Sequence, residues 1–219
     1  YIYSTSWAGG LQRFNFTDDT PEWEIIPLPM DDQSQLICGD IDIDEYELNP
    51  KDPGDGGNHN HKGFSVFYED NTLWVGTANG LNKGVIVDDC IDWSHYSTAD
   101  GLSGNWVVGI DSGFASDNEE LRRLWAISWA TVSTENTGLS YSLDNGVSWQ
   151  FVNYFTDAGL KVYNLEISDE RIYASTIEGL YVSEDGEHWE LIPNFIDSIT
   201  GEMIMYDAVY TAHALNGAD

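Results

Sequence analysis

The stretch LWVGTANGL at residues 73–81 decides the fold, because related stretches occur three more times along the chain. They read IYSTSWAGGL at 2–11, LWAISWATVSTENTGL at 124–139 and IYASTIEGL at 172–180. Each is followed by a tryptophan after a similar gap: Trp23, Trp93, Trp149 and Trp189. A sequence unit that repeats with insertions of varied length predicts a repeat architecture.

Each repeat has the pattern of short β-strands. The aliphatic-aromatic-small run alternates with a period of two, a glycine turn follows, and the tryptophan opens another strand. A further strand is predicted upstream of each run, at 64–68, 106–110, 162–167 and 209–215. Four short antiparallel strands in a unit of about 40 to 50 residues are typical of a β-propeller blade. The predicted fold class is therefore all-β, with no helix of ordinary length.

The predicted organisation is one propeller region over residues 1–219. Blades are expected at about 1–30, 62–99, 104–154 and 160–197, with an additional inner strand at 206–215. The first unit lacks its innermost strand, and the last segment has the pattern of an innermost strand without outer partners. The chain either closes a ring of four blades or belongs to a larger propeller, and common blade numbers favour the larger one. Residues 31–61 depart from the repeat as an acidic insertion rich in glycine and histidine.

Two turns carry a more specific motif. It is formed by Ser142, Asp144, Gly146 and Trp149 and, one residue shorter, by Ser183, Asp185, Gly186 and Trp189. The motif resembles the Asp-box, or BNR repeat, of sialidase-like and sortilin-like propellers. The aspartate can accept hydrogen bonds from its own turn, the glycine suits a left-handed conformation, and the tryptophan is expected to pack between blades. We therefore interpret these residues as structural and not as catalytic.

Other stretches resemble a second group of propellers. LWVGTANGLNK at 73–83 and WSHYSTADGLS at 93–103 are similar to repeats of two-component-regulator-type propellers and of secreted bacterial propellers with sorting domains. The resemblance implies a propeller fold and a secreted or cell-surface location in a bacterium. It implies little about function, because this fold hosts sensors, hydrolases, lyases and adhesins.

The charge excludes several partners. The 219 residues contain 38 acidic and 8 basic side chains, for a formal charge of −30. Nucleic acid and anionic lipid require a basic face, so neither is expected as a partner. No run of apolar residues is long enough to insert into a membrane. The acidity is compatible with an extracellular surface, with adaptation to high salt, or with calcium binding.

The insertion contains the candidate metal ligands. A strand over residues 40–44 would place Asp40, Asp42 and Asp44 on one face, where calcium would relieve their repulsion; a solvated acidic edge is the alternative. His59 and His61 lie two positions apart, with Asp52 and Asp55 nearby, and could direct two imidazoles to one metal such as zinc. Two surface histidines in a polar loop are the alternative. Of these metals, calcium is the cofactor that the sequence favours.

Cys38 and Cys90 lie 52 positions apart and match no metal-binding spacing. In an oxidising compartment a disulfide between them would tie the insertion to the blades. Two free buried thiols are the alternative.

The function that these features favour is non-catalytic recognition or scaffolding, assisted by calcium, with a protein or glycan ligand on the loop-bearing face. One alternative is a glycoside hydrolase or lyase acting on neutral polysaccharide, with Asp100 and Asp157 as candidate acids. Another is the sensor domain of a two-component regulator. A sialidase is not expected, because the resemblance implies three arginines on inner strands. The chain has only four arginines, Arg13, Arg122, Arg123 and Arg171, none of them in a predicted inner strand.

Overall fold

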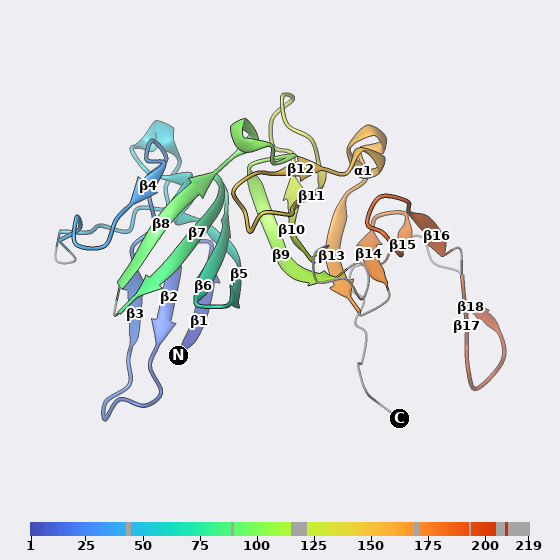
Figure 1. Cartoon of the computed structure of the whole chain (residues 1–219), viewed down its shortest axis with the longest axis horizontal. Helices are drawn as coiled ribbons and strands as arrows, with labels where there is room; N and C mark the ends of the chain where they lie inside the picture. Colours follow the sequence, from blue (N-terminus) through green and yellow to red (C-terminus); the bar gives the residue numbers. More distant parts are fainter. Residues whose placement is uncertain are drawn as a thin grey trace.

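The computed structural model describes residues 1–42, 45–88, 90–114, 122–168, 171–192, 194–204 and 209. Figure 1 shows antiparallel sheets arranged side by side along an arc. The strands are β1 (Ile2–Ser6), β2 (Gly10–Phe14), β3 (Trp23–Ile26), β4 (Gln35–Leu36), β5 (Gly63–Glu69), β6 (Thr72–Thr77), β7 (Gly80–Val87), β8 (Cys90–Tyr96), β9 (Trp106–Phe114), β10 (Arg122–Trp129), β11 (Gly138–Ser142), β12 (Gln150–Phe151), β13 (Val162–Ile167), β14 (Ile172–Thr176), β15 (Gly179–Ser183), β16 (Glu190–Ile192), β17 (Phe195–Ile196) and β18 (Met203–Ile204). The helices are the 3-10 turns η1 (Pro53–Asp55), η2 (His59–His61) and η3 (Thr98–Asp100) and the short α-helix α1 (Asn153–Ala158).

The sheets reproduce the sequence repeat. Their strand orders are β1-β2-β3, then β5-β6-β7-β8 with β4 added beyond β8, then β9-β10-β11-β12, then β13-β14-β15-β16, and β17 pairs with β18. The glycine of each repeat pairs with the same position of the preceding strand: Ser6 with Gly10, Thr77 with Gly80, Ser128 with Gly138, and Thr176 with Gly179. The repeat therefore gives equivalent positions in the four sheets.

The predicted inner strands are present as β5, β9 and β13. Successive sheets meet along these strands, since β1 contacts β5, β5 contacts β9, and β9 contacts β13. Of the predicted strand at 209–215, only Val209 lies within the described residues, and its N–H donates to the carbonyl oxygen of Thr176 at 3.0 Å. The first sheet has three strands, as the sequence predicts.

The core consists of three apolar clusters, and each fills the space between two successive sheets. Trp93, Trp149 and Trp189 are buried in these clusters. Trp23 differs, because 50% of its surface is exposed. The two Asp-box tryptophans therefore pack between sheets as expected, whereas Trp23 lies in the first of the described sheets, with no earlier one to cover it.

One further feature differs from the sequence predictions. The chain forms turns and bends from Cys38 to Ile41 and is irregular at Asp42, so the strand considered for residues 40–44 is absent at Asp40 and Asp42. Asp44 lies outside the described residues. The helix α1 forms between the third and fourth sheets, and its Phe155 is fully buried in the cluster between them. Among the described residues no helix is long and apolar enough to cross a membrane.

Candidate functional site

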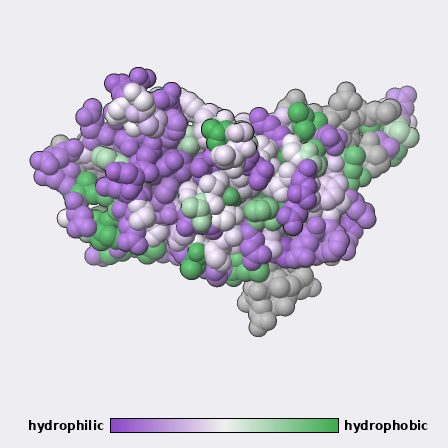
Figure 2. Space-filling model, turned by 90° about the horizontal axis from the view of Figure 1, so that it is seen from above, coloured by the Kyte–Doolittle hydropathy of each residue, from purple (hydrophilic) through white to green (hydrophobic). Residues whose placement is uncertain are grey.

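The strands run between two faces of the molecule. One face carries the hairpin turns after β1, β6, β10 and β14, together with η2, η3 and α1. This face is called the loop face, and Figure 2 shows the molecule from this side. The turns between β11 and β12 and between β15 and β16 lie at the other ends of the same strands, on what is called the Asp-box face. Most of the surface seen in Figure 2 is hydrophilic, with separate hydrophobic patches.

The first Asp-box turn satisfies its own polar groups. The hydroxyl of Ser142 donates to Asp144 Oδ1 at 2.8 Å and accepts from the N–H of Gly146 at 2.7 Å. The hydroxyl and the N–H of Ser148 donate to the two carboxylate oxygens of Asp144, at 2.6 and 2.8 Å. These hydrogen bonds, those from Ser148 first, lower the pKa of Asp144 to about 2. The carboxylate is a fixed acceptor of its turn.

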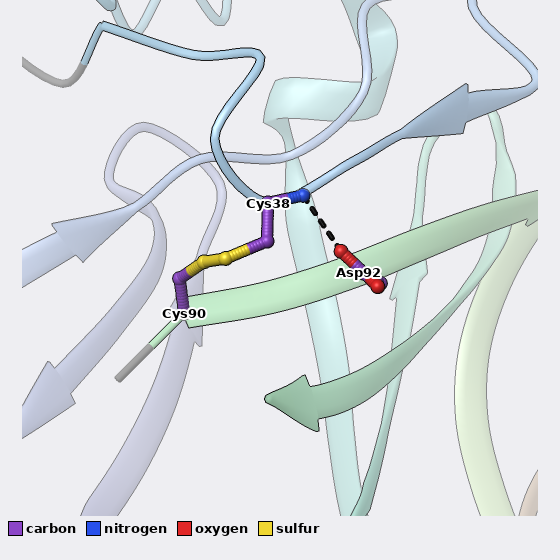
Figure 3. Close-up of a disulfide and its surroundings, with 3 residues drawn as sticks. All are labelled: Cys38, Cys90 and Asp92. Atoms are coloured by element: carbon purple, nitrogen blue, oxygen red, sulfur yellow. Dashed lines mark hydrogen bonds between the residues drawn. A yellow bond between two sulfur atoms is a disulfide. The ribbon is translucent and has the colours of Figure 1, made fainter. Parts of the chain in front are cut away.

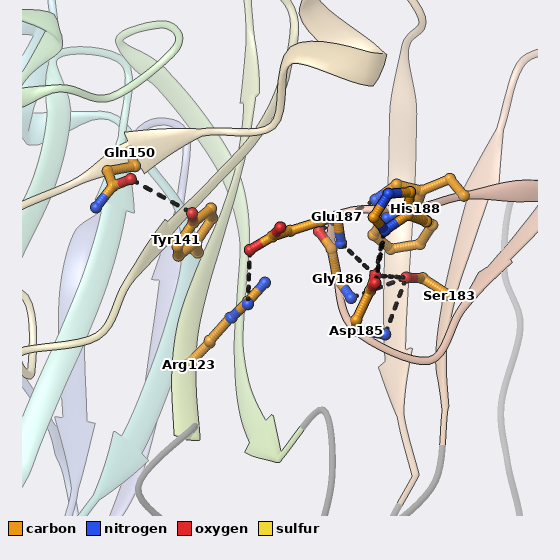
Figure 4. A network of polar contacts seen from close by, with 9 residues as sticks. Arg123, Tyr141, Gln150, Ser183, Asp185, Gly186, Glu187 and His188 are labelled. Atoms are coloured by element: carbon orange, nitrogen blue, oxygen red, sulfur yellow. Dashed lines mark hydrogen bonds and ion pairs between the residues drawn. The ribbon is translucent and has the colours of Figure 1, made fainter.

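The second Asp-box turn has the same design (Figure 4). The N–H groups of Glu187 and His188 each donate to Asp185 Oδ1 at 2.8 Å, and His188 Nδ1 lies 2.6 Å from Oδ2. Desolvation opposes ionisation of Asp185, but these bonds and that from Ser183 together hold its pKa far below the usual range. The same pairing raises the pKa of His188.

Each Asp-box turn packs on the preceding sheet. Trp149 lies edge to face with Trp74 at a centroid distance of 6.3 Å, and Trp189 lies likewise with Trp125 at 6.5 Å. Gly146 has a φ of +79°, and a Cβ there would lie 2.2 Å from Trp74 Cη2. The turn therefore needs glycine both for its conformation and for this close approach.

Basic side chains complete these contacts between sheets. Lys83 Nζ donates to the carbonyl oxygen of Asn145 at 2.6 Å. The buried guanidinium of Arg123 lies 4.6 Å from the ring centroid of Tyr141 and 3.3 Å from Glu187 Oε1 (Figure 4). The sequence analysis assigned no role to Lys83, because its partner Asn145 is distant in sequence. The Asp-box residues thus join sheets, and the serine and aspartate side chains of both turns already have hydrogen-bond partners within the turn.

Cys38 and Cys90 form a disulfide in the structure, with their Cα atoms 5.8 Å apart (Figure 3). The N–H of Cys38 also donates to Asp92 Oδ1 at 2.6 Å. Cys90 begins β8 at the turn that corresponds, in the second repeat, to the two Asp-box turns. The disulfide thus anchors the insertion at that turn.

A buried polar network fixes the other half of the insertion. The carboxylate of Asp31 accepts from the N–H groups of His59 and Asn60 at 2.9 and 2.7 Å. The amide of Asn60 is fully buried and bonds to Thr77 and Asn82, at 2.7 and 2.8 Å. Because every partner is buried or half-buried, residues 58–61 are held firmly against the strands β6 and β7.

His61 is part of this scaffold. Its side chain is buried; Nδ1 accepts from the N–H of Asn49 at 2.9 Å and Nε2 lies 3.2 Å from the hydroxyl of Tyr46. Burial lowers the pKa of His61 and raises that of Tyr46 to about 12. Both ring nitrogens have protein partners, so His61 and His59 do not present two free imidazoles to one metal.

His59 belongs to a separate charged group with Asp52 and Lys62. His59 Nε2 lies 3.1 Å from Asp52 Oδ1, and the ammonium of Lys62 contacts the same oxygen. The hydrogen bonds from Lys62 and then from His59 lower the pKa of Asp52. Asp40, Asp42 and Asp55 are exposed, and no group of three potential metal ligands occurs among the described residues.

Three aromatic rings meet beside this charged group, and the sequence analysis did not single them out. Trp7, Phe64 and Trp106 have pairwise centroid distances of 5.3 to 5.5 Å. They come from the hairpin after β1, from β5 and from β9, and are called the aromatic cluster. Trp7 is 49% exposed, while Phe64 and Trp106 are half-buried. The ammonium of Lys62 lies 5.0 Å from the ring centroid of Trp7, so the charged group adjoins the rings.

Asp100 and Asp157 occupy connections between sheets. Asp100 caps η3, accepting from the N–H of Ser97 at 2.8 Å, and Asp157 is an exposed residue of α1. Asp100 thus has the structural role of a capping residue.

Comparison with known proteins gives a likeness of fold. No family model matches the sequence, and no curated protein matches it. The β-propeller domain of Cps50 (Swd1) from Myceliophteria thermophila superposes with a TM-score of 0.50 at 13% identity, over 96% of this chain and 57% of that one. The sheets are arranged as in a β-propeller. The extracellular domain of the hybrid two-component system BT4673 from B. thetaiotaomicron aligns at 14% identity with a TM-score of 0.44, over 91% of this chain and 27% of that one. This chain therefore spans little more than half of the first structure and about a quarter of the second.

Proposed function

We propose that this chain is a non-catalytic recognition module of a secreted or cell-surface β-propeller, and that it binds its ligand on the loop face. The observation that carries the proposal is the aromatic cluster, in which rings from three sheets meet and Trp7 keeps half of its surface in contact with solvent. Exposed aromatic side chains supply large contact areas at a low cost in side-chain entropy, so they are favoured at binding sites.

The surroundings of the cluster support binding. The insertion, which carries His59 and ends one residue before Lys62, is held by the buried network of Asp31 and Asn60. Polar groups are thereby fixed beside the rings before a ligand arrives, which reduces the cost of ordering them on binding.

The chemistry beside the rings favours recognition over hydrolysis. A glycosidase needs a carboxylic acid that is protonated near its working pH. The carboxylate adjoining the cluster is Asp52, and Lys62 and His59 lower its pKa. Asp52 therefore remains ionised at neutral pH and is suited to accept hydrogen bonds from a ligand.

The proposal includes calcium at the insertion, where Asp40, Asp42 and Asp44 follow one another at alternate positions of the sequence and Asp52 and Asp55 lie further along it. Calcium binding to the folded state would raise the melting temperature with metal concentration. The melting temperature is measured in excess chelator and in millimolar calcium. An equal melting temperature in both would remove calcium from the proposal.

The binding face is tested by comparing Trp7→Ala with Phe16→Ala. Phe16 is 60% exposed in the turn after β2, on the opposite face from Trp7. An array of glycans and peptides is probed with the parent and both variants, and released reducing ends are assayed in parallel. Loss of binding in Trp7→Ala alone, without turnover, is the expected result. Turnover that Asp100→Asn or Asp157→Asn abolishes would contradict the proposal and favour a hydrolase.

A further inference from the structure

We infer that the loop face carries two equivalent subsites and takes an extended, neutral polysaccharide chain. This inference rests on the proposed function and adds to it the class of ligand and a second contact point. The second subsite is formed by Trp129 and Lys161, two sheets along the arc from Trp7 and Lys62.

The two tryptophans occupy the same position of the repeat. Trp7 follows Ser6, which pairs with Gly10, and Trp129 follows Ser128, which pairs with Gly138. Trp7 begins the hairpin turn after β1 and Trp129 is the last residue of β10, so both lie at the loop face. The corresponding residues of the second and fourth sheets are Ala78 and Ile177, so the indole occurs in alternate sheets.

The two lysines are equivalent in the same way. Lys62 and Lys161 each precede the inner strand of the next sheet. The carbonyl oxygen of Lys62 accepts from the N–H of Ala78, and that of Lys161 accepts from the N–H of Ile177, both at 3.1 Å. Each lysine extends over the indole of the preceding sheet, with Nζ 5.0 Å from the Trp7 ring and 3.7 Å from the Trp129 ring.

At each subsite, other aromatic side chains pack against the tryptophan. At the first, Phe64 and Trp106 pack against Trp7. At the second, Tyr163 lies edge to face with Trp129 at 5.9 Å, and Trp129 Nε1 donates to the carbonyl oxygen of Val162 at 2.8 Å. The indole of Trp129 is therefore fixed in orientation, as a binding platform requires.

Several observations select a neutral sugar over a charged ligand. An aromatic ring offers an apolar surface to the C–H face of a sugar ring. The exposed carboxylate of Asp52, paired with the buried ammonium of Lys62 that lies over Trp7, provides an acceptor for hydroxyl groups. A cationic ligand would compete with the ammonium that already lies over each indole. An anionic ligand would be repelled by the net charge of −30, and Asp52 already pairs with Lys62.

The presence of two equivalent subsites favours a polymeric ligand over a small one. A ligand that engages one subsite is held at a high effective concentration near the other, so a chain that spans both binds much more tightly than a fragment that reaches only one. A polysaccharide presents the same sugar face at regular intervals, so it can offer one sugar ring to each of the two indole–ammonium pairs.

The test uses three neutral polymers, a mixed-linkage β-glucan, a galactomannan and an arabinoxylan, each with its own tetrasaccharide. Titration calorimetry on the parent is expected to show one polymer that binds at least about tenfold more tightly than its tetrasaccharide. The tetrasaccharide is expected to bind with two sites per chain in the parent and one in Trp7→Ala or Trp129→Ala. Each variant should lose at least about tenfold in polymer affinity. Trp23→Ala, which removes a half-exposed indole from the edge strand β3, is the matched control.

The outcomes separate the inference from the proposed function. Polymer binding that Trp7→Ala abolishes and Trp129→Ala leaves unchanged would overturn the second subsite and leave the proposed function standing. Preference for an anionic polymer such as polysialic acid, or binding to none of the three neutral polymers, would overturn the ligand class. If Trp129→Ala fails to fold, as judged by its melting temperature, Lys161→Met provides the same comparison. Equal polymer affinity in Lys161→Met and the parent would then contradict the inference.

Discussion

The two faces of the molecule use the same residue types in opposite ways. On the Asp-box face, Trp149 and Trp189 are buried against the preceding sheet, and Asp144 and Asp185 accept hydrogen bonds from their own turns. On the loop face, Trp7 is half-exposed, and Asp52 bonds to a lysine and a histidine beside it. The role of each of these tryptophans and aspartates therefore depends on the face of the molecule on which it lies.

This difference indicates a division of labour. The Asp-box face holds successive sheets together, so its side chains have few polar groups left for a ligand. The loop face is supported by those sheets and by the insertion, which the disulfide and the Asp31 network hold in place. It can therefore expose aromatic rings. The same separation of scaffold and binding loops is common in folds that host many functions.

The largest expected effect is the loss of a tryptophan from the Asp-box face. Trp149→Ala empties the contact with Trp74 in the cluster between the second and third sheets, which is expected to cost about 3–5 kcal/mol of unfolding free energy. Trp23→Ala removes an equivalent repeat residue that is half-exposed, so its cost should be much smaller. Urea denaturation of both variants measures the difference, and equal midpoints would contradict the inter-sheet role of Trp149.

Trp149 and Trp23 also mark what the sequence could and could not predict. The repeat of aliphatic-aromatic strands and Gly-Leu turns predicts the sheets, their strand order and the two Asp-box turns, because these depend on local pattern. The exposure of Trp23 depends on whether another sheet covers it. The spacing from Gly-Leu to the tryptophan is similar at Trp23 and Trp149, so the repeat pattern alone does not distinguish them.

The candidate site was less predictable for the same physical reason. Trp7, Phe64 and Trp106 lie up to 99 positions apart and meet only because the sheets lie side by side. His61 looked like a metal ligand from its spacing to His59, yet burial between Tyr46 and Asn49 decides its role. One signal was available: Trp7 and Trp129 recur at the same offset from the repeat, outside its strand pattern.

The next effect concerns the disulfide at the start of β8. It closes a loop with a sequence separation of 52 residues, so Cys38→Ser/Cys90→Ser is expected to lose about 2–4 kcal/mol of stability. Intact mass with and without reductant and alkylation first establishes the bond, and urea denaturation then gives the loss. Two thiols that alkylate freely without reductant would contradict the bond.

A smaller effect is expected from Trp7→Ala on stability. Half of the ring is exposed, so its removal should cost about 1 kcal/mol, well below the cost at Trp149. Thermal and urea unfolding measure it. A loss as large as that of Trp149→Ala would show that the aromatic cluster is a structural core and not a binding surface.

The smallest effect is the pH dependence of the first Asp-box turn. The folded-state pKa of Asp144 is about 2, below its ordinary value of 3.8, so its stabilising contribution is complete above about pH 4 and is lost as the pH falls through about 2. Asp144→Asn should therefore be less stable than the parent at pH 7, and the difference should vanish toward pH 2. Urea midpoints of both proteins across this range test it. A difference that persists at pH 2 would show that the ionised carboxylate is not what matters.

The division between a binding face and a structural face is tested most directly by amide hydrogen exchange with and without a bound polysaccharide. Slower exchange is predicted in the turn after β1, in residues 59–64 and at the start of β9, with no change in the turns 142–149 and 183–189. Protection at these two Asp-box turns, with none at Trp7, would contradict the account.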